Sequence, residues 1–284
     1  MYKRQVSNDD IVRLMVGREL QNRFNAMKEN VSNLAHETVF EVRNVTSRDR
    51  KKVRDISFSV CRGEILGFAG LVGSGRTELM NCLFGVDKRA GGEIRLNGKD
   101  ISPRSPLDAV KKGMAYITES RRDNGFFPNF SIAQNMAISR SLKDGGYKGA
   151  MGLFHEVDEQ RTAENQRELL ALKCHSVNQN ITELSGGNQQ KVLISKWLCC
   201  CPEVIIFDEP TRGIDVGAKA EIYKVMRQLA DDGKVILMVS SELPEIITVC
   251  DRIAVFCEGR LTQILTNRDD MSEEEIMAWA LPQE

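Results

Sequence analysis

A glycine-rich stretch, GLVGSGRTE at residues 70–78, most constrains what this chain can fold into. It follows the apolar run EILGFAG and precedes RTELMNCLFG, where Leu79, Leu83 and Phe84 recur at helical spacing before Gly85. A strand that leads through a glycine loop into a helix is the setting in which backbone N–H groups hold a phosphate. Arg76 stands where the form G-x-x-x-x-G-K-[ST] has Lys. Alone the stretch is weak support for a phosphate site, because glycine turns also occur for purely backbone reasons.

Apolar patterning on both sides of this loop predicts an α/β fold. Residues 39–68 contain the runs VFEVRNV and ISFSV, whose β-branched and aromatic content suits strands, and GEIRLNG indicates another strand and turn. From residue 184, KVLISKWL, EVIIFDEP, AEIYKVMRQLADDG and KVILMVSS alternate between helical and strand patterns. Such alternation is typical of a parallel sheet covered on both faces. Residues 132–173 are rich in helix formers and are predicted to form a separate helical lobe.

The charge balance argues against a nucleic acid or an anionic membrane surface as a bulk partner. Lys and Arg number 39 against 40 Asp and Glu, and the net charge is −1. No apolar run approaches the roughly 20 residues that a membrane span needs, and no charged-then-apolar leader follows Met1. We therefore expect this 284-residue fragment to be soluble in itself and cytoplasmic.

The eight cysteines and three histidines lack the spacing of a metal site, because Cys199, Cys200 and Cys201 are contiguous and the other cysteines are scattered. Several lie in apolar segments, where a free Cys behaves as a small buried hydrophobe, and this indicates a reducing compartment.

Two further segments contain residue types that suit catalysis and anion binding. VIIFDE at 204–209 is an apolar run ending in two carboxylates, as expected where a strand delivers Asp208 to a Mg²⁺-bound water and Glu209 to the water that attacks a γ-phosphate. LSGGNQQ at 184–190 places Ser185 and two glycines before a helix, where backbone N–H groups can meet an anion. Acidic pairs after strands are common and the second segment could be a capped turn. All three segments together, in this order, argue against coincidence.

With these segments in place, the chain resembles a nucleotide-binding domain of the ATP-binding cassette (ABC) transporter family over about residues 39–265. GLVGSGRT is similar to the Walker A motif of that family, LSGGNQQ to its signature, VIIFDEPT to its Walker B motif and RGID to its D-loop, and DRIAVFCEGRL matches its closing strands. The resemblance implies a P-loop NTPase with a mostly parallel core sheet, an N-terminal antiparallel β subdomain and an inserted helical subdomain at about 126–190. Residues 39–284 would form this domain.

The resemblance also implies that ATP and Mg²⁺ are held between two cassettes, with the Walker A motif of one facing the signature of the other. On this chain the resemblance assigns nucleotide binding to Gly70, Val72, Gly73, Ser74, Gly75, Arg76, Thr77 and Glu78. It assigns Mg²⁺ binding to Thr77, Glu119 and Asp208. It assigns catalysis to Glu209 and Ser241. It assigns contact with the partner's nucleotide to Leu184, Ser185, Gly186, Gly187 and Gln189, and the D-loop to Asp215.

Within the family, GLVGSGRTE, LSGGNQQK and DEPTRGIDVGAK are similar to the second cassette of tandem ATPases that drive ribose-, galactose- and allose-type sugar importers, and we expect the D-allose type. The implied partners are a first cassette on the same full-length chain or a second copy of this one, two membrane permease subunits and, indirectly, a periplasmic sugar-binding protein. The implied location is peripheral, on the cytoplasmic face of the inner membrane.

An internal similarity agrees with a tandem. VSNDDIVRLMV at 6–16 and MSEEEIMAWAL at 271–281 share Ser, an acidic pair and Ile at the same offsets. Chance similarity of two helix starts is one explanation. The other is that residues 1–38 are the tail of a preceding cassette followed by a linker.

Four departures from the family pattern predict a degenerate site on this chain. Arg76 replaces the Walker A Lys, Glu119 replaces the usual Gln, and Ser241 replaces the switch His. No aromatic residue lies at 47–51 to stack on adenine. We expect weak nucleotide binding and slow hydrolysis here, whereas the signature and Glu209 look intact.

Three functions compete on these grounds. The leading hypothesis is an energy-coupling ATPase of a sugar importer, and the second is a non-hydrolysing scaffold whose signature activates its partner. A soluble ABC protein of repair or translation would carry a basic face or a long coiled-coil insertion, and the sequence shows neither. Phe126, Phe127 and Phe130 lie where the membrane subunits of the family dock, although packing between core and lobe explains them equally well.

Overall fold

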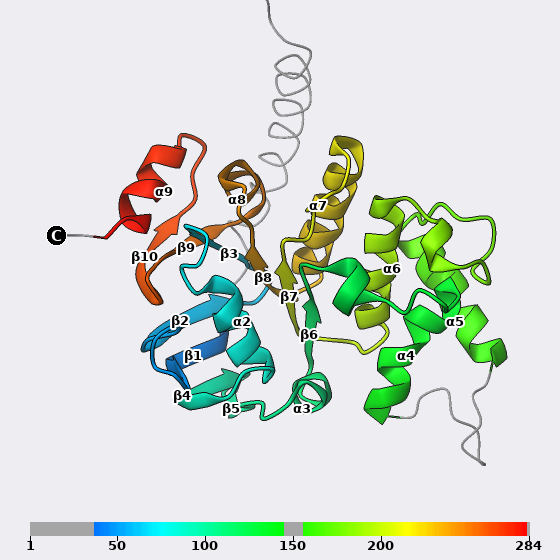
Figure 1. Cartoon of the computed structure of the whole chain (residues 1–284), viewed down its shortest axis with the longest axis horizontal. Coiled ribbons are helices and arrows are strands. Elements are labelled where there is room, and N and C mark those ends of the chain that lie inside the picture. The colour runs from blue at the N-terminus through cyan, green and yellow to red at the C-terminus, as the bar shows by residue number, and fades with distance from the viewer. Residues whose placement is uncertain (1–36, 145–155, 283–284) are drawn as a thin grey trace, which may run out of the picture.

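Two sheets form the body of the molecule in a computed structural model of the chain, which describes residues 37–144 and 156–282 (Figure 1). The smaller sheet is antiparallel, with strand order β2-β1-β4-β5. Its strands are β1 (Thr38–Ser47), β2 (Ile56–Cys61), β4 (Arg89–Leu96) and β5 (Lys99–Asp100). The predicted tail and linker at 1–38 lie almost entirely outside the described residues.

The larger sheet has six strands in the order β10-β9-β3-β8-β7-β6. Four of its pairings are parallel, and only that between β9 and β10 is antiparallel. The strands are β3 (Ile65–Gly70), β6 (Met114–Ile117), β7 (Val204–Asp208), β8 (Val235–Val239), β9 (Arg252–Cys257) and β10 (Arg260–Thr266). The predicted mostly parallel core sheet is confirmed, and the carboxyl ends of β3, β7 and β8 meet at one edge.

Helices cover this sheet and build a lobe beside it (Figure 1). The helices on the body are α2 (Arg76–Phe84), α3 (Pro106–Lys111), α7 (Val216–Asp231), α8 (Leu243–Val249) and α9 (Glu273–Ala280). The lobe contains α4 (Ile132–Asp144), α5 (Glu156–Leu169), the short 3₁₀ helix η3 (Ile181–Glu183) and α6 (Gly186–Leu198). The π-helix η2 (Arg121–Gly125) joins β6 to the lobe.

Three apolar clusters explain this arrangement. One lies between the two sheets and includes Phe40, Phe68 and Phe256. A second lies on the other face of the large sheet under α6 to α9, and a third fills the lobe. Helix α6 supplies Ile194 to the second cluster and its neighbours Val192 and Leu193 to the third. Because one helix contributes to both cores, α6 packs the lobe onto the sheet.

Two elements differ from the sequence-based expectation. Strand β4 begins at Arg89, before the predicted GEIRLNG, and its register against β1 shifts between Arg43 and Thr46. Gly92 lies at the shift with φ 99°, where an added Cβ would stand 2.5 Å from the Val45 Cα. The π-helix η2 was not predicted, since a π turn has no distinct apolar period in the sequence.

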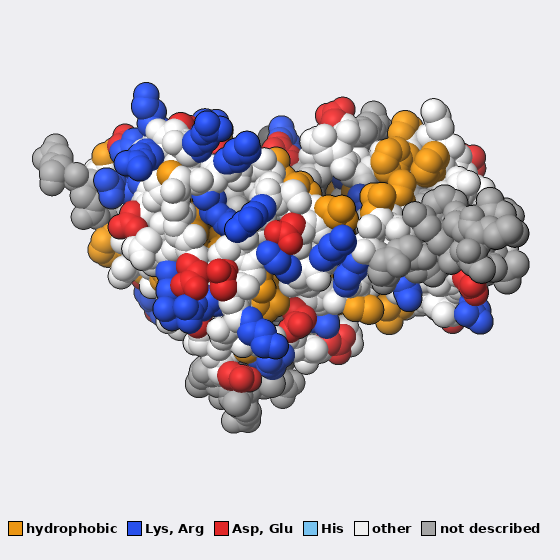
Figure 2. Space-filling model, turned by 90° about the horizontal axis from the view of Figure 1, so that it is seen from below, with side chains coloured by type: hydrophobic (Ala, Val, Ile, Leu, Met, Phe, Trp, Pro, Cys, Tyr) orange, Lys and Arg blue, Asp and Glu red, His pale blue; other side chains and the backbone are white. Residues whose placement is uncertain are grey.

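The surface has mixed character. On the face seen in Figure 2, Lys and Arg side chains are interspersed with Asp and Glu, and apolar side chains gather at the end that carries the lobe. Large exposed apolar side chains of the lobe region include Phe127, Leu142 and Leu169. Within the described residues, every helix is too short or too polar to cross a bilayer.

Candidate functional site

The glycine loop between β3 and α2 is shaped by close backbone approaches. Gly75, the N-cap of α2, has φ 105°, and a Cβ there would stand 2.3 Å from the Lys52 carbonyl oxygen. A Cβ on Gly70 would stand 2.5 Å from the Phe256 carbonyl oxygen. The turn that carries Lys52 and the end of β9 therefore both touch the loop, and only glycine fits at these two positions.

The loop has the features of an anion cradle. It opens into the nine-residue helix α2, whose first backbone N–H groups have no partners within the helix. The Ser74 hydroxyl is buried and has no hydrogen-bond partner among the described residues. Gly73 has open space around it, and Val72 is 92% exposed. These residues fit a bound phosphate group.

Arg76 does not reach out toward solvent. Its side chain is buried, and Nη1 donates a hydrogen bond of 2.6 Å to the Ser240 carbonyl oxygen. Burial lowers the pKa of the guanidinium, although the nearby carboxylates of Glu209 and Asp208 act in the opposite direction. The positive charge thus lies inside the site, with one donor held by the backbone that follows β8.

Asp208, at the end of β7, is the centre of a hydroxyl cluster. Its carboxylate accepts hydrogen bonds from the Thr77 hydroxyl at 3.3 Å and from the Tyr116 hydroxyl at 2.9 Å. Burial raises the pKa of Asp208, and these two hydroxyl groups oppose the rise. Burial also raises the pKa of Tyr116 above its usual range, which keeps that phenol a donor.

Glu209 and Ser241 lie together, as the sequence predicts. The Ser241 hydroxyl donates to the Glu209 carboxylate at 3.1 Å, and the Glu209 backbone N–H donates to the Val239 carbonyl at 2.9 Å. Glu209 has φ 49°, a left-handed conformation that costs a non-glycine residue about 1 kcal/mol or more. Burial raises the pKa of Glu209, while the Ser241 hydrogen bond and the charge of Arg76 lower it.

The donor set beside the loop suits a small hard cation. The Thr77 hydroxyl and the Asp208 carboxylate supply oxygen ligands next to the phosphate cradle, and Mg²⁺ takes such ligands together with substrate phosphates. Among the described residues, no cluster of three or more His, Cys, Asp or Glu could hold a metal by itself. Mg²⁺ that is bound by one or two carboxylates usually takes substrate phosphates and waters as its other ligands.

Two predicted site residues have other partners in the structure. The Glu119 carboxylate forms an ion pair with Arg212, so its role as a Mg²⁺ ligand stays a prediction. The Glu78 carboxylate forms an ion pair with Lys52 at 3.4 Å, which ties α2 to the turn that rests on Gly75.

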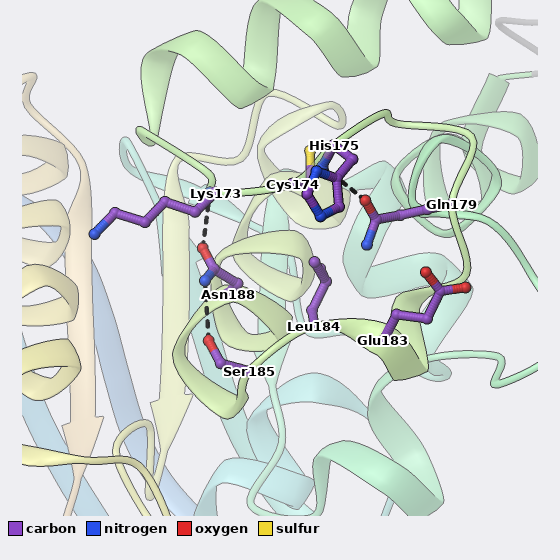
Figure 3. Close-up of a pocket in the computed structure, with 8 residues that line it drawn as sticks. All are labelled: Lys173, Cys174, His175, Gln179, Glu183, Leu184, Ser185 and Asn188. Carbon is purple, nitrogen blue, oxygen red and sulfur yellow. Dashed lines mark hydrogen bonds between the residues drawn. The ribbon is translucent and has the colours of Figure 1, made fainter.

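The signature residues lie at the start of α6, away from the glycine loop along the chain. Ser185 is the exposed N-cap, and its hydroxyl accepts a hydrogen bond of 2.9 Å from the Asn188 amide. A Cβ on Gly187 would stand 2.5 Å from the Ala218 Cβ, so the start of α6 is in close contact with α7. The loop before the helix and its first turn border a cavity of about 410 Å³ (Figure 3).

This cavity is lined by Lys173, Cys174, His175, Gln179, Glu183, Leu184, Ser185 and Asn188. The Asn188 side chain bridges two of its walls, because it accepts from the Lys173 backbone N–H at 2.9 Å and donates to Ser185 (Figure 3). The Lys173 side chain extends away from the other lining residues in that view.

The remaining predicted residues divide between surface and core. Asp215 caps α7, where its carboxylate accepts from the Ala218 N–H at 3.0 Å. Leu184 is buried in the lobe core. Gln189 is also buried, and its amide donates to the Ile181 carbonyl at 3.3 Å. A contact between the Gln189 side chain and a partner's nucleotide stays a prediction, since this side chain points inward.

The three phenylalanines after Glu119 differ in their burial. Phe126 is buried in the lobe core, as the packing explanation requires. Phe127 is 48% exposed and stacks on Phe130 with ring centroids 5.1 Å apart. Among the described residues no cysteine forms a disulfide; Cys201 is exposed, whereas Cys199 and Cys200 are buried.

Sequence reasoning missed Tyr116 and the network around Glu245. Glu245 is buried, and it accepts hydrogen bonds from Thr211 at 2.6 Å, from Ser240 at 2.9 Å and from Lys219 at 2.8 Å. Burial raises the pKa of Glu245, but the hydrogen bonds outweigh it and the net shift is downward. Nothing in the sequence marks these residues, because all of these contacts except that between Ser240 and Glu245 join separate segments of the chain.

Comparison with known proteins shows which protein family this chain resembles. Residues 53–212 match the family model described as ABC transporter. A ribose import ATP-binding protein of Bacillus cereus is 43% identical over 278 residues, which cover 97% of this chain and 54% of that protein. A galactose/methyl galactoside import ATP-binding protein of Clostridium tetani is 43% identical over 275 residues, covering 97% of this chain and 53% of that protein. The chain thus spans about half the length of these relatives.

Solved structures agree on the fold. A nucleotide-free ATP-binding cassette from an ABC transporter superposes with a TM-score of 0.73 at 21% identity and covers 87% of this chain and 100% of that one. A dimeric ATP-binding cassette bound to ADP and Pi superposes with a TM-score of 0.68 at 20% identity, covering 81% of this chain and 99% of that one. The expected fold, with its antiparallel β subdomain and helical subdomain, is confirmed.

Proposed function

The chain belongs to the ABC transporter family, and on that premise we propose that it is an ATP-binding and ATP-hydrolysing cassette that powers import of a monosaccharide. The observation that carries this proposal is the meeting of three segments at one sheet edge. Thr77 from the glycine loop contacts Asp208 at the end of β7, and Ser241 after β8 contacts Glu209. The names of the relatives, which are sugar import ATP-binding proteins, support the transported class.

The residues of this chain have separable tasks. The loop from Gly70 to Thr77 binds the phosphates, and the buried Ser74 hydroxyl gains a partner there. Thr77 and Asp208 would hold Mg²⁺, which offsets phosphate charge when it is bound. Glu209 orients the attacking water and accepts its proton, and Ser241 holds the Glu209 carboxylate in place.

We propose that this site works slowly. Arg76 must leave the Ser240 carbonyl, or share its donors, before it can meet a phosphate. The turn over Gly75 carries Lys51 and Lys52 but no aromatic ring for adenine. Ser241 cannot supply the cationic charge that a His can carry near neutral pH.

The signature of this chain would complete the site of a partner cassette. Ser185 is exposed at the N-terminus of α6, where backbone N–H groups can meet a γ-phosphate held by another cassette. Because the chain spans about half of its relatives' length, we propose that the partner is a first cassette on the same full-length chain, and that this chain is the second. The similarity of residues 6–16 to residues 271–281 supports this order, although the earlier segment lies outside the described residues.

The other expectations follow from the same proposal. The transported sugar would be of the ribose or galactose type, with D-allose as the narrower expectation. The partners would be two permease subunits, contacted in part by Phe127 and Phe130, and indirectly a periplasmic sugar-binding protein. The cassette would lie on the cytoplasmic face of the membrane.

A non-hydrolysing scaffold is the second candidate. The hydrogen bond from Arg76 to the Ser240 carbonyl favours it, because this bond keeps the cation from the loop. In that case Ser185 would still contact the nucleotide of the partner cassette, while Glu209 would take no part in hydrolysis.

Steady-state Mg·ATP hydrolysis by the purified chain, measured over a range of protein concentrations, separates the two candidates. Glu209→Gln controls for contaminating ATPase. A turnover number that rises with protein concentration and disappears in Glu209→Gln would support hydrolysis in a self-paired sandwich. A rate equal to that of the control at every concentration would sink the hydrolytic proposal and leave the scaffold.

A further inference from the structure

The Arg121 side chain, at the start of η2, lies between two glycine carbonyls from separate segments. Nη1 donates to the Gly186 carbonyl at 3.5 Å, and Nη2 donates to the Gly213 carbonyl at 3.2 Å. A Cβ on either glycine would stand 3.5 Å from Nη2. The guanidinium therefore occupies the space beside both glycines.

The two segments that Arg121 joins belong to different sites. Gly186 is the first residue of α6 and part of the signature. Gly213 lies in the turn between Glu209 and Asp215, the N-cap of α7. Arg121 thus connects the start of α6, which would contact the nucleotide of a partner cassette, with the turn that follows Asp208 and Glu209.

Neighbouring contacts hold the Arg121 segment in place. Glu119, two residues earlier, pairs with Arg212, the residue before Gly213. At the other end of η2 the Gly125 carbonyl accepts a hydrogen bond of 2.5 Å from Lys196, which is buried in α6. Since η2 contacts α6 through both of its ends, the two helices have little freedom to move separately.

We propose that Arg121 is a positioning residue that fixes the start of the signature helix relative to the turn after Glu209. This proposal rests on the proposed function only for the identity of the sites that are joined. A guanidinium suits the task because its planar fork can donate to two carbonyl oxygens at once. The compact ammonium of a Lys is a point charge and would leave at least one carbonyl without this partner.

The experiment measures backbone hydrogen exchange in the nucleotide-free chain for wild type, Arg121→Ala and Arg121→Lys. Two amides report on the joined segments: the Gln189 N–H, which donates to Ser185, and the Ile214 N–H, which donates to Thr211. We expect Arg121→Ala to speed exchange at both by about tenfold, the factor for losing one hydrogen bond from a charged donor. Arg121→Lys should restore protection at no more than one of them.

Two comparisons separate positioning from general stabilisation. Arg161→Ala removes an exposed arginine of α5 that pairs with Asp158, and it should leave both amides unchanged. Exchange of the central strands β7 and β8 should also stay unchanged in Arg121→Ala. Unchanged exchange at Gln189 and Ile214, or faster exchange throughout β7 and β8, would overturn the proposal.

Hydrolysis gives a second readout. If the chain turns over ATP, Arg121→Ala should lower kcat by about tenfold with little change in KM, because the groups are misplaced rather than lost. If wild type has no activity, the hydrolytic proposal fails, while the exchange result still decides the role of Arg121. A lower kcat with unchanged exchange would refute positioning.

Discussion

At the scale of single residues, Arg76 is the largest departure from a phosphate loop with Lys. Its Nη1 is 2.6 Å from the Ser240 carbonyl oxygen, so one donor is already used. We predict that Arg76→Lys binds Mg·ATP about tenfold more tightly, since a compact ammonium can rotate toward the phosphates. Titration with a fluorescent ATP analogue at fixed Mg²⁺ measures the change in Kd.

The matched control for this variant is Arg62→Lys, which makes the same replacement before β3, at the opposite end of that strand from the loop. It should leave the Kd unchanged. An Arg76→Lys protein with equal or weaker affinity would show that the Ser240 hydrogen bond does not limit binding.

Ser241 gives a prediction of pH dependence. Burial raises the pKa of Glu209, and the Ser241 hydrogen bond lowers it. Ser241→Ala removes the lowering contribution, so the folded pKa of Glu209 should rise further. As the proposed base, Glu209 can accept a proton only when it is ionised, so activity should be lost as the pH falls through that pKa. The acid limb of the kcat/KM profile should move to higher pH in Ser241→Ala.

The neighbouring Ser240→Ala is the comparison, because the Ser240 hydroxyl donates to Glu245 and not to Glu209. Its acid limb should stay where the wild-type limb lies. Superimposable acid limbs for wild type and Ser241→Ala would contradict the role given to this hydrogen bond.

At the scale of elements, the contact between α6 and α7 depends on a missing side chain. A Cβ on Gly187 would stand 2.5 Å from the Ala218 Cβ. We predict that Gly187→Ala lowers the free energy of unfolding by about 1–3 kcal/mol through overpacking. Urea denaturation of the purified variant measures the change.

The adjacent Gly186→Ala is the control for this element, because its added Cβ finds its nearest neighbour at 3.5 Å, an ordinary contact. The double variant Gly187→Ala with Ala218→Gly should recover part of the loss. If Gly186→Ala is as destabilising as Gly187→Ala, helix composition and not the crossing is responsible.

The sequence predicts the elements that lie at the sheet edge better than it predicts their side-chain partners. Asp208 ends a fully buried strand, and parallel strands bring such ends together, so its contact with Thr77 could be foreseen. The Glu119–Arg212 ion pair and the inward Gln189 could not. Each depends on how η2 and α6 pack against distant segments, and no local pattern encodes that packing.

At the scale of the whole molecule, the proposed sandwich requires each site to use residues from two cassettes, which are two copies of this chain when it pairs with itself. A Ser185→Arg chain keeps its own Thr77 and Asp208 but blocks the signature at the exposed start of α6. An Asp208→Asn chain loses its own site but keeps a normal signature. Neither variant alone can assemble a complete site in a symmetric pair.

Mixing the two inactive variants should therefore restore hydrolysis. In an equal mixture, half of the dimers are mixed and one of their two sites is complete, which gives about one quarter of the wild-type activity per chain. A mixture of Asp208→Asn with Glu209→Gln serves as the control, because both changes fall in the same half-site and no complete site can form. No restoration in the test mixture of folded variants from an active parent would mean that each chain completes its own site. Restoration in the control would mean that Asp208 and Glu209 lie in different half-sites, which would contradict the proposed division of the sandwich.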